Sequence, residues 1–331
     1  MLDHPKVYVT SNIPEAGLTL LKEKFKLNFH QPLGQQITED ELIEAAKSHD
    51  ALITTLTDPV TERVAAAGQN GGKLKVVANY GAGYDNIAVD AFSNADIRVT
   101  NTPGVLHETT ADLTFALIMG IARRINEAEK FLRSGQFQGW KPDLLLGEDV
   151  HDRTIGIIGM GEIGQAVAKR ALGFNMEVIY YNRSYLSQER EQELQAQYKS
   201  LEELLSESDF VSIHVPLTNN TQHMITAKEF SQMKNSAFLI NTSRGPVIDE
   251  QALVDALKTG EIQGAALDVF EKEPEVHPEL LDRQDCLLVP HIGSATHKCR
   301  NNMSEMACKN VEAVLDGQEP PTPVDSIEPW R

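Results

Sequence analysis

Arg244, Glu273 and His291 are residues whose types could together carry out chemistry on a carbonyl group. A guanidinium binds a carboxylate through two parallel hydrogen bonds. A histidine can donate or accept a proton near neutral pH, and a carboxylate beside it favours the protonated form. Taken singly, each has a structural alternative: a hydrogen-bonding residue at a strand end for His291, a helix cap or surface ion pair for Arg244, and a plain loop acid for Glu273. Taken together, they suit the reduction of a carbonyl next to a carboxylate, with His291 as the proton donor.

A glycine pattern earlier in the chain indicates the source of the electrons. A short apolar run ends at Gly159, which with Gly161 and Gly164 forms G-x-G-x-x-G, and helical spacing and a second strand at Glu177–Tyr181 follow. In such a turn the first glycine allows the tight bend, the second lets phosphates approach, and the third lets helix and strand pack closely. The N–H groups at the helix start then face the anion. A glycine-rich turn without a ligand is the alternative, but the complete context predicts a dinucleotide site and hydride transfer from a nicotinamide.

The three candidate catalytic residues are expected at one edge of one parallel sheet. Each follows an apolar run that reads as a strand, and ligands of open parallel sheets lie outside the carboxyl ends of the strands. Six strands, the number of a complete dinucleotide-binding sheet, are expected at Thr154–Ile158, Glu177–Tyr181, Phe210–His214, Ala237–Asn241, Gly264–Asp268 and Cys286–Val289. The polar segment Gln188–Gln197 reads as a solvated helix face.

The first hundred residues predict a separate α/β domain without a phosphate-binding fingerprint. Apolar strands alternate with helices, which favours a parallel sheet covered by helices. Thr38 is an expected N-cap with Glu41 as its capping-box partner. The expected strands are Lys6–Thr10, Leu27–Gln31, Ala51–Leu56, Leu74–Asn79 and Ile97–Asn101, and the expected helices are Pro14–Lys24, Thr38–Lys47, Thr61–Ala67 and Asn86–Asn94.

The connections between the two domains complete the predicted architecture. Thr102-Pro103-Gly104 marks the first boundary, Glu108–Leu132 reads as one long helix, and an irregular arm, Gly135–Gly147, carries Trp140. A last helix, about Ala295–Leu315, finds no place in a six-stranded sheet, so we expect it to return to the first domain. The fold class is therefore α/β, with two doubly wound parallel-sheet domains, a hinge and a cleft between them. The expected domains are residues 1–102 with 297–331, flavodoxin-like and substrate-binding, and residues 103–296, a Rossmann dinucleotide-binding domain.

Composition excludes several classes of function. The net charge of −18 and pI near 5.0 argue against a nucleic-acid or anionic-membrane partner. No apolar run reaches the length of a membrane span, and the start lacks a signal-peptide pattern. Three cysteines without a C-x-x-C predict neither a disulfide framework nor a zinc site, and no other metal site is expected. A cytoplasmic location is expected.

Four motifs in order give the sequence a specific resemblance. They are Gly159–Gly164, Asn241–Gly245, Leu267–Phe270 with Glu273-Pro274, and Pro290–Ala295. With them the chain resembles the D-isomer-specific 2-hydroxyacid dehydrogenases over essentially its whole length, and within that family it is most similar to the glyoxylate/hydroxypyruvate reductases.

The resemblance implies roles for individual residues. Arg244 would anchor the substrate, His291 would be the acid/base and Glu273 its partner. It also implies a homodimer joined through the nucleotide domains, in which Trp140 either reaches the neighbour's active site or is a buried hydrophobic anchor. The implied substrate-binding residues are Ala82, Gly83, Arg244, His291, Ser294 and Trp140. The candidate cofactor-binding residues are Gly159, Gly161, Glu162, Ile163, Gly164, Asn182, Arg183, Ser184, Pro216, Thr242, Asp268 and Gly293, with Asp268 at the nicotinamide end.

The end of the second strand predicts the choice of cofactor. NAD enzymes place an acid about twenty residues past the glycines, where it hydrogen-bonds the ribose 2′-hydroxyl. Here that position reads Tyr181-Asn182-Arg183-Ser184, without an acid. Arg183 and Ser184 can bind a 2′-phosphate, so we expect NADPH to be preferred over NADH. The alternative is that Arg183 stacks on adenine and both cofactors work.

The expected reaction is reduction of small 2-oxo acids, glyoxylate or hydroxypyruvate, to glycolate or D-glycerate. One alternative is a D-2-hydroxyacid dehydrogenase for a bulkier 2-oxo acid. Another is an NAD(H)-sensing binding protein similar to the family's transcriptional corepressors, which keep the same three residues. The acid at Glu273 argues against formate dehydrogenases, which carry glutamine there. The chain is also too short for the regulatory domain of many phosphoglycerate dehydrogenases.

Overall fold

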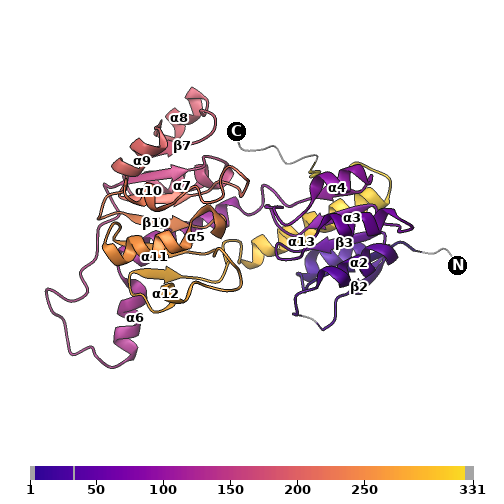
Figure 1. The fold of residues 1–331 in the computed structure, drawn as a ribbon, viewed down its shortest axis with the longest axis horizontal. Helices are drawn as coiled ribbons and strands as arrows, with labels where there is room; N and C mark the ends of the chain where they lie inside the picture. Colours follow the sequence, from indigo (N-terminus) through magenta and orange to yellow (C-terminus); the bar gives the residue numbers. More distant parts are fainter. Residues whose placement is uncertain (1–3, 33, 325–331) are drawn as a thin grey trace. The chain divides into compact units, whose positions relative to one another are not determined.

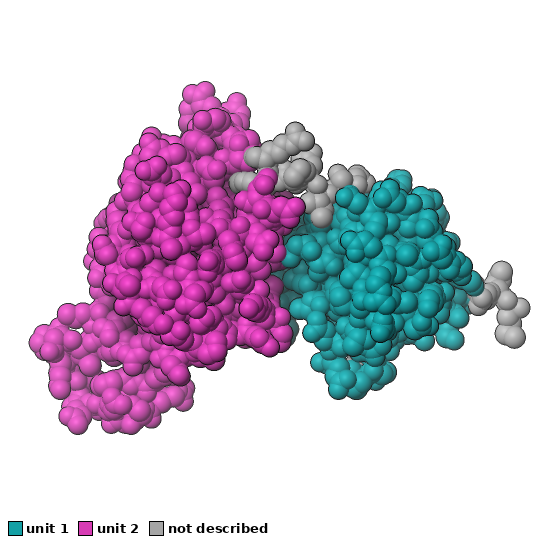
Figure 2. Space-filling model, in the orientation of Figure 1, with its two compact units in different colours: residues 1–106, 294–328 teal, residues 107–293, 329–331 magenta. Residues whose placement is uncertain are grey.

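The computed structural model describes residues 4–32 and 34–324. Among these residues the chain divides into two compact units, drawn in different colours in Figure 2. Unit 1 runs to residue 106 and resumes at residue 294, and unit 2 comprises residues 107–293. Each unit is a parallel sheet covered by helices (Figure 1). None of the described helices combines the length and apolar composition needed to cross a membrane.

Unit 1 is built on five parallel strands in the order β2-β1-β3-β4-β5, the flavodoxin-like order. All residues of β3 and β4 are buried, because helices cover both faces of the sheet. One core lies between the sheet and α1 with α13, and the other lies on the side of α2, α3 and α4. The strands are β1 (Lys6–Val9), β2 (Lys26–Phe29), β3 (Ala51–Thr54), β4 (Val76–Asn79) and β5 (Arg98–Thr100). The helices are α1 (Glu15–Lys22), α2 (Glu39–Ser48), α3 (Glu62–Gln69), α4 (Val89–Asn94) and α13 (His297–Leu315).

The last helix, α13, packs against α1 of unit 1. Gly17 of α1 faces the backbone of Ser304, and a Cβ on Gly17 would overlap the Ser304 carbonyl. The Ser304 hydroxyl donates to the Pro14 carbonyl at 2.6 Å and accepts from the Gly17 N–H at 3.2 Å. A glycine and a short hydroxyl therefore let two helices far apart in sequence approach closely.

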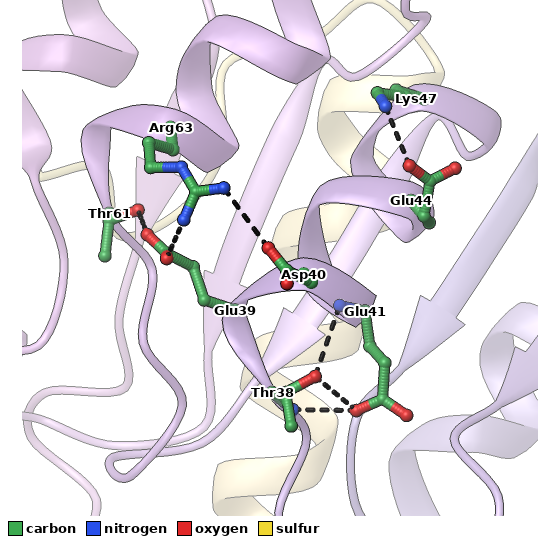
Figure 3. A network of polar contacts seen from close by, with 8 residues as sticks. All are labelled: Thr38, Glu39, Asp40, Glu41, Glu44, Lys47, Thr61 and Arg63. Atoms are coloured by element: carbon green, nitrogen blue, oxygen red, sulfur yellow. Dashed lines mark hydrogen bonds and ion pairs between the residues drawn. The ribbon is translucent and has the colours of Figure 1, made fainter.

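The capping box predicted at the start of α2 is confirmed. The Thr38 side chain accepts from the Glu41 N–H, and the Glu41 carboxylate accepts from the Thr38 N–H at 2.8 Å (Figure 3). Neighbouring acids of α2 pair with Arg63 of α3, which binds Glu39 and also Asp40 at 3.2 Å. These contacts stabilise the helix pair on the side of unit 1 that carries α2 and α3.

Unit 2 contains a parallel sheet in the order β12-β11-β10-β9-β6-β7-β8. The six predicted strands are present as β6 (Thr154–Ile158), β7 (Glu177–Tyr181), β9 (Phe210–Ile213), β10 (Phe238–Asn241), β11 (Gly264–Leu267) and β12 (Cys286–Leu288). The remaining elements are α5 (His107–Ala122), α6 (Ile125–Arg133), α7 (Glu162–Leu172), α8 (Gln188–Leu194), β8 (Ala196–Tyr198), α9 (Leu201–Glu207), α10 (Ala227–Phe230), the 3₁₀ turn η1 (Gly245–Val247), α11 (Glu250–Thr259) and α12 (Pro278–Leu281).

The edge strand β8 begins within a segment that was predicted to be entirely helical. The polar segment Gln188–Gln197 was expected to be a solvated helix, but the helix ends at Leu194. Gln195 adopts a left-handed conformation, with φ 47°, and the chain then pairs with β7. Leu194 and Ala196 are buried in the core of unit 2, and this burial favours a strand in spite of the polar composition.

The prediction of a single long helix over Glu108–Leu132 is also wrong. The segment forms two helices, α5 and α6, separated at Arg124, whose φ is 51°. The Glu148 N–H donates to the Ala122 carbonyl at 2.8 Å, so the returning chain satisfies the end of α5. The Arg124 side chain in turn binds Glu127 at 2.8 Å and the Leu146 carbonyl at 3.1 Å. Contacts with residues more than twenty positions away therefore end this helix, and the left-handed residue at the break is an arginine.

Candidate active site

The three glycines of the fingerprint have separate roles in the turn from β6 to α7. Gly159 has φ 99°, and a Cβ there would lie 2.7 Å from the His214 carbonyl carbon. A Cβ on Gly164 would overlap the Gly159 carbonyl, so this glycine allows α7 to approach β6. A Cβ on Gly161 would enter open space, with no atom within 4 Å. Gly161 is the N-cap of α7 and has no side-chain cap, so the helix start can accept an anion.

The loop after β7 is tied to the glycine turn. The Asn182 Oδ1 accepts from the Met160 N–H at 3.4 Å, and its Nδ2 donates to the Ser184 carbonyl at 3.1 Å. Arg183 and Ser184 are exposed. The glycine turn and this loop can therefore hold, respectively, the pyrophosphate and the adenosine end of a dinucleotide.

Arg244 lies on a turn that the buried side chain of Asn241 organises. The Asn241 Oδ1 accepts from the Ser243 N–H at 3.0 Å and from the Ser243 hydroxyl at 2.9 Å, and its Nδ2 donates to the Arg244 carbonyl at 2.9 Å. The next residue, Gly245, packs directly on the backbone of Phe270. The sequence analysis named Arg244 but missed Asn241 and Gly245, although both lie within its motif.

His291 and Glu273 form a hydrogen-bonded pair. The His291 Nδ1 lies 2.8 Å from the Glu273 Oε2, and the Glu273 Oε1 accepts from the Phe270 N–H at 3.0 Å. Because an ionised carboxylate only accepts, Nδ1 carries the shared hydrogen and Nε2 remains as the nitrogen that can exchange a proton. Burial alone would raise the pKa of Glu273, but its hydrogen bond to His291 and the charges of His291 and Arg244 outweigh burial and lower it. Glu273 is therefore ionised at neutral pH.

Asp268 fixes the backbone that carries His291. Its carboxylate oxygens accept from the Ile292 N–H at 2.6 Å and from the Gly293 N–H at 2.8 Å, while its carbonyl accepts from the His291 N–H at 2.8 Å. His291 has φ 51°, a left-handed conformation that few non-glycine residues adopt. Burial raises the pKa of Asp268, against the opposing effect of the two N–H groups. Both carboxylate oxygens are thus engaged in holding the loop, a role that the sequence analysis did not foresee.

In unit 1, a loop after β4 presents backbone N–H groups. The carbonyls of Gly81, Ala82 and Gly83 accept respectively from the Thr102 N–H at 2.9 Å, Asn101 Nδ2 at 2.7 Å and Asn79 Nδ2 at 2.7 Å. Among the described residues, the N–H groups of Ala82 and Gly83 have no acceptor. The loop therefore has the form of an anion site, with its carbonyls bound back to the sheet edge.

The remaining candidate cofactor-binding and substrate-binding residues lie at separate places in the fold. Glu162 and Ile163 begin α7, while Pro216 is exposed after β9. Thr242 is buried, with its hydroxyl 3.0 Å from the Thr114 hydroxyl. Ser294 begins the second segment of unit 1, and Trp140 is 83% exposed on the arm before β6. Unit 2 thus brings together the glycine turn, Arg244, Glu273, Asp268 and His291 at the carboxyl ends of its strands, whereas Trp140 stands apart. Among the described residues, no group of three His, Cys, Asp or Glu side chains could hold a metal ion.

Comparisons with known proteins agree with this geometry. Residues 115–293 match the model of the D-isomer specific 2-hydroxyacid dehydrogenase NAD binding domain. Over 325 residues the chain is 47% identical to a glyoxylate reductase of Thermococcus litoralis, covering 97% of both chains. It is 48% identical over 324 residues to a glyoxylate reductase of Korarchaeum cryptofilum, covering 97% of this chain and 96% of that protein. The structure of an NADPH-dependent glyoxylate/hydroxypyruvate reductase of Sinorhizobium meliloti in complex with NADP and malonate matches with a TM-score of 0.84, at 32% identity and 97% coverage of both chains.

The cofactor implied by this family fits the residues present, since Gly161 leaves open space at an uncapped helix start where phosphates can approach. The matches to whole chains cover both units. The chain belongs to the D-isomer-specific 2-hydroxyacid dehydrogenase family and is an NAD(P)-dependent oxidoreductase acting on CH–OH donors.

Proposed function

We propose that the protein reduces small 2-oxo acids, glyoxylate and hydroxypyruvate, to glycolate and D-glycerate with NADPH. The observation that carries the proposal is the His291–Glu273 pair, 2.8 Å apart, on the strand edge of unit 2 that also bears Arg244 and the glycine turn. The names of the curated relatives support the substrate class. When bound, the nicotinamide supplies a hydride to the carbonyl carbon.

The chain's own residues supply the remaining chemistry. Arg244 anchors the substrate through its carboxylate and carbonyl oxygens. The ionised Glu273 accepts from the His291 Nδ1–H and so orients the ring, and the His291 Nε2 donates the proton to the carbonyl oxygen that receives the negative charge. In the reverse direction, the neutral imidazole accepts the hydroxyl proton.

The direct test measures oxidation of NADPH by absorbance with glyoxylate, hydroxypyruvate, pyruvate and 2-oxoisocaproate in parallel. We expect fast turnover with glyoxylate and hydroxypyruvate and slower turnover with 2-oxoisocaproate. His291→Ala should lower kcat by about 100-fold or more while leaving NADPH binding nearly unchanged. The control His151→Ala removes an exposed imidazole and should change neither. Equal losses of kcat and of NADPH affinity in His291→Ala would assign His291 a structural role.

The preference for NADPH rests on the loop Asn182-Arg183-Ser184. An acid at this position would repel a 2′-phosphate, whereas a guanidinium and a hydroxyl can bind it. We expect kcat/KM to be higher with NADPH than with NADH, and Arg183→Ala to reduce that ratio. Comparable kcat/KM values for the two cofactors in the unmodified protein would contradict the preference.

A homodimer is the second part of the proposal. The segment from Ile125 to Leu146 stands out from the body of unit 2, as Figures 1 and 2 show. Five large apolar side chains of this one segment are exposed, and a concentration of exposed apolar side chains favours an association site. They are Ile125, Leu132, Phe137, Trp140 and Leu146. Light scattering should give twice the mass of the chain, and the double substitution Phe137→Ser with Leu146→Ser should shift the mass toward one chain. A monomeric unmodified protein would refute this assignment.

A further inference from the structure

The loop that would recognise the adenosine end of the cofactor is fixed by contacts that the glycine motif does not supply. Residues 182–187 connect β7 to α8, and Arg183 and Ser184 lie at the exposed part of this loop. An exposed loop binds a phosphate well only when its conformation is already held, because ordering it on binding costs conformational entropy. The loop therefore needs a buried group that holds its conformation.

The hydroxyl of Tyr180 is that group. Tyr180 lies in β7, is fully buried, and belongs to the core on one face of the unit 2 sheet. Its hydroxyl accepts from the Leu186 N–H at 2.9 Å and donates to the Glu191 Oε1 of α8 at 2.6 Å. Burial and the bond to Glu191 raise the pKa of Tyr180 to about 12, so the hydroxyl is protonated throughout the physiological range.

The other end of the loop is bound to the glycine turn. Asn182 accepts from the Met160 N–H and donates to the Ser184 carbonyl. From α8, the Arg190 Nε donates to the Gln165 Oε1 at 2.6 Å, and the Gln165 Nε2 donates to the Met160 carbonyl at 3.0 Å. Arg183 and Ser184 are thus carried on a short segment whose two ends are both fixed, one by Asn182 and the other by Tyr180.

We propose that Tyr180 is a positioning residue for cofactor discrimination, because its buried hydroxyl fixes the loop that presents Arg183 and Ser184. This inference rests on the proposed NADPH preference. Removing the hydroxyl leaves the ring in the core and the charge of Arg183 unchanged. It releases the Leu186 N–H and Glu191, so the loop gains alternative conformations that no longer present both groups to a 2′-phosphate. Binding of a cofactor without that phosphate should change little.

A matched control lies in the same aromatic cluster. The ring of Tyr198 packs edge-on against Tyr180 at 5.5 Å, and among the described residues its hydroxyl has no hydrogen-bond partner. Tyr198→Phe therefore removes a hydroxyl from the same neighbourhood without releasing the loop. It should separate an effect of the Tyr180 hydrogen bonds from a general effect of losing a tyrosine hydroxyl.

The experiment measures binding of 2′,5′-ADP and 5′-AMP by calorimetry to the full-length protein, Tyr180→Phe and Tyr198→Phe, with kcat/KM for NADPH and NADH alongside. In the unmodified protein we expect 2′,5′-ADP to bind more tightly than 5′-AMP. Tyr180→Phe should lower this preference about three- to tenfold, the size of one net hydrogen bond, with 5′-AMP binding and NADH turnover retained. Tyr198→Phe should keep the preference.

Each other outcome decides a different point. An unmodified protein that binds both nucleotides equally would overturn the proposed NADPH preference, and this inference with it. A Tyr180→Phe protein that keeps the full preference, in an unmodified background that shows it, would overturn the inference alone. Should Tyr180→Phe fail to fold by its circular-dichroism melt, Glu191→Ala decides: it leaves Tyr180 in place but removes the acceptor that orients its proton, and an undiminished preference would overturn the inference.

Discussion

Gly245→Ala tests whether the arginine turn and the glutamate loop are held against each other. A Cβ at position 245 would overlap the carbonyl carbon and oxygen of Phe270 and the nitrogen of Glu271. These are backbone atoms, so no side chain can rotate away, and the two segments must separate by about 1 Å to reach ordinary contact distance. Arg244 precedes the overlap on one segment, and Glu273 follows it on the other. A displacement of about 1 Å in a catalytic group can cost about 100-fold in rate.

We therefore expect Gly245→Ala to lower kcat/KM by about 100-fold and the free energy of unfolding by about 1–3 kcal/mol. Binding of the dinucleotide should fall less than kcat/KM, because the glycine turn that holds the pyrophosphate belongs to another part of the sheet edge. Steady-state kinetics, a thermal melt and NADPH fluorescence titration measure the three quantities. Gly173→Ala is the control, since that glycine has ordinary helical dihedrals and its Cβ would approach only the Arg170 carbonyl, at 3.3 Å. A Gly245→Ala enzyme with kcat/KM within about twofold of the unmodified protein would refute the reasoning.

Three further predictions concern protonation and loop support. Glu273→Gln removes the carboxylate that accepts from the His291 Nδ1–H, so kcat should fall in steady-state kinetics while NADPH binding is retained, and an unchanged kcat would contradict the pairing. Asp268→Asn keeps the size of the side chain but can no longer accept from both the Ile292 and Gly293 N–H groups. We expect the free energy of unfolding to fall by about 1–3 kcal/mol in a denaturant titration, and kcat to fall in steady-state kinetics. Burial lowers the pKa of His214 to about 3, so between that value and about pH 6.5 the unfolded chain binds a proton that the folded chain does not. Stability should therefore fall as the pH drops through this window, by about 2 kcal/mol at pH 5 from this residue, and His214→Gln should show a smaller loss of Tm.

Local patterns predicted the elements whose causes are local. The capping box at Thr38 and Glu41 needs only four consecutive residues, and the buried strands β3 and β4 are recognisable as short apolar runs because helices cover both faces of the sheet. The break at Arg124 could not be read in this way. It depends on the chain at Leu146–Glu148 returning to the end of α5, and its left-handed residue is an arginine rather than a glycine.

The candidate site divides in the same manner. The glycine turn and the trio Arg244, Glu273 and His291 followed from residue type and from the expected strand ends. The residues that hold this trio in place could not be predicted from the sequence, because a buried Asn or Asp at a strand end has many possible hydrogen-bond partners. Only the fold shows that both oxygens of Asp268 bind the backbone beyond His291, and that Tyr180 binds the loop after its own strand.

Both units use the same means to place polar groups at the edge of an apolar sheet. β4 ends in the buried Asn79, whose amide donates to the Gly83 carbonyl, and β10 ends in the buried Asn241, whose amide donates to the Arg244 carbonyl. Asp268, one residue past β11, binds the backbone of the loop that carries His291. In each case a buried polar side chain at a strand end satisfies backbone groups of a loop at the same sheet edge, either the loop that follows its own strand or, for Asp268, the loop that follows β12. These hydrogen bonds fix the loop backbone, so its remaining N–H groups and side chains are available to a ligand. In each unit, the chemistry at the strand ends therefore depends on buried residues whose side chains bind the loop backbone: Asn79 in unit 1, and Asn241 and Asp268 in unit 2.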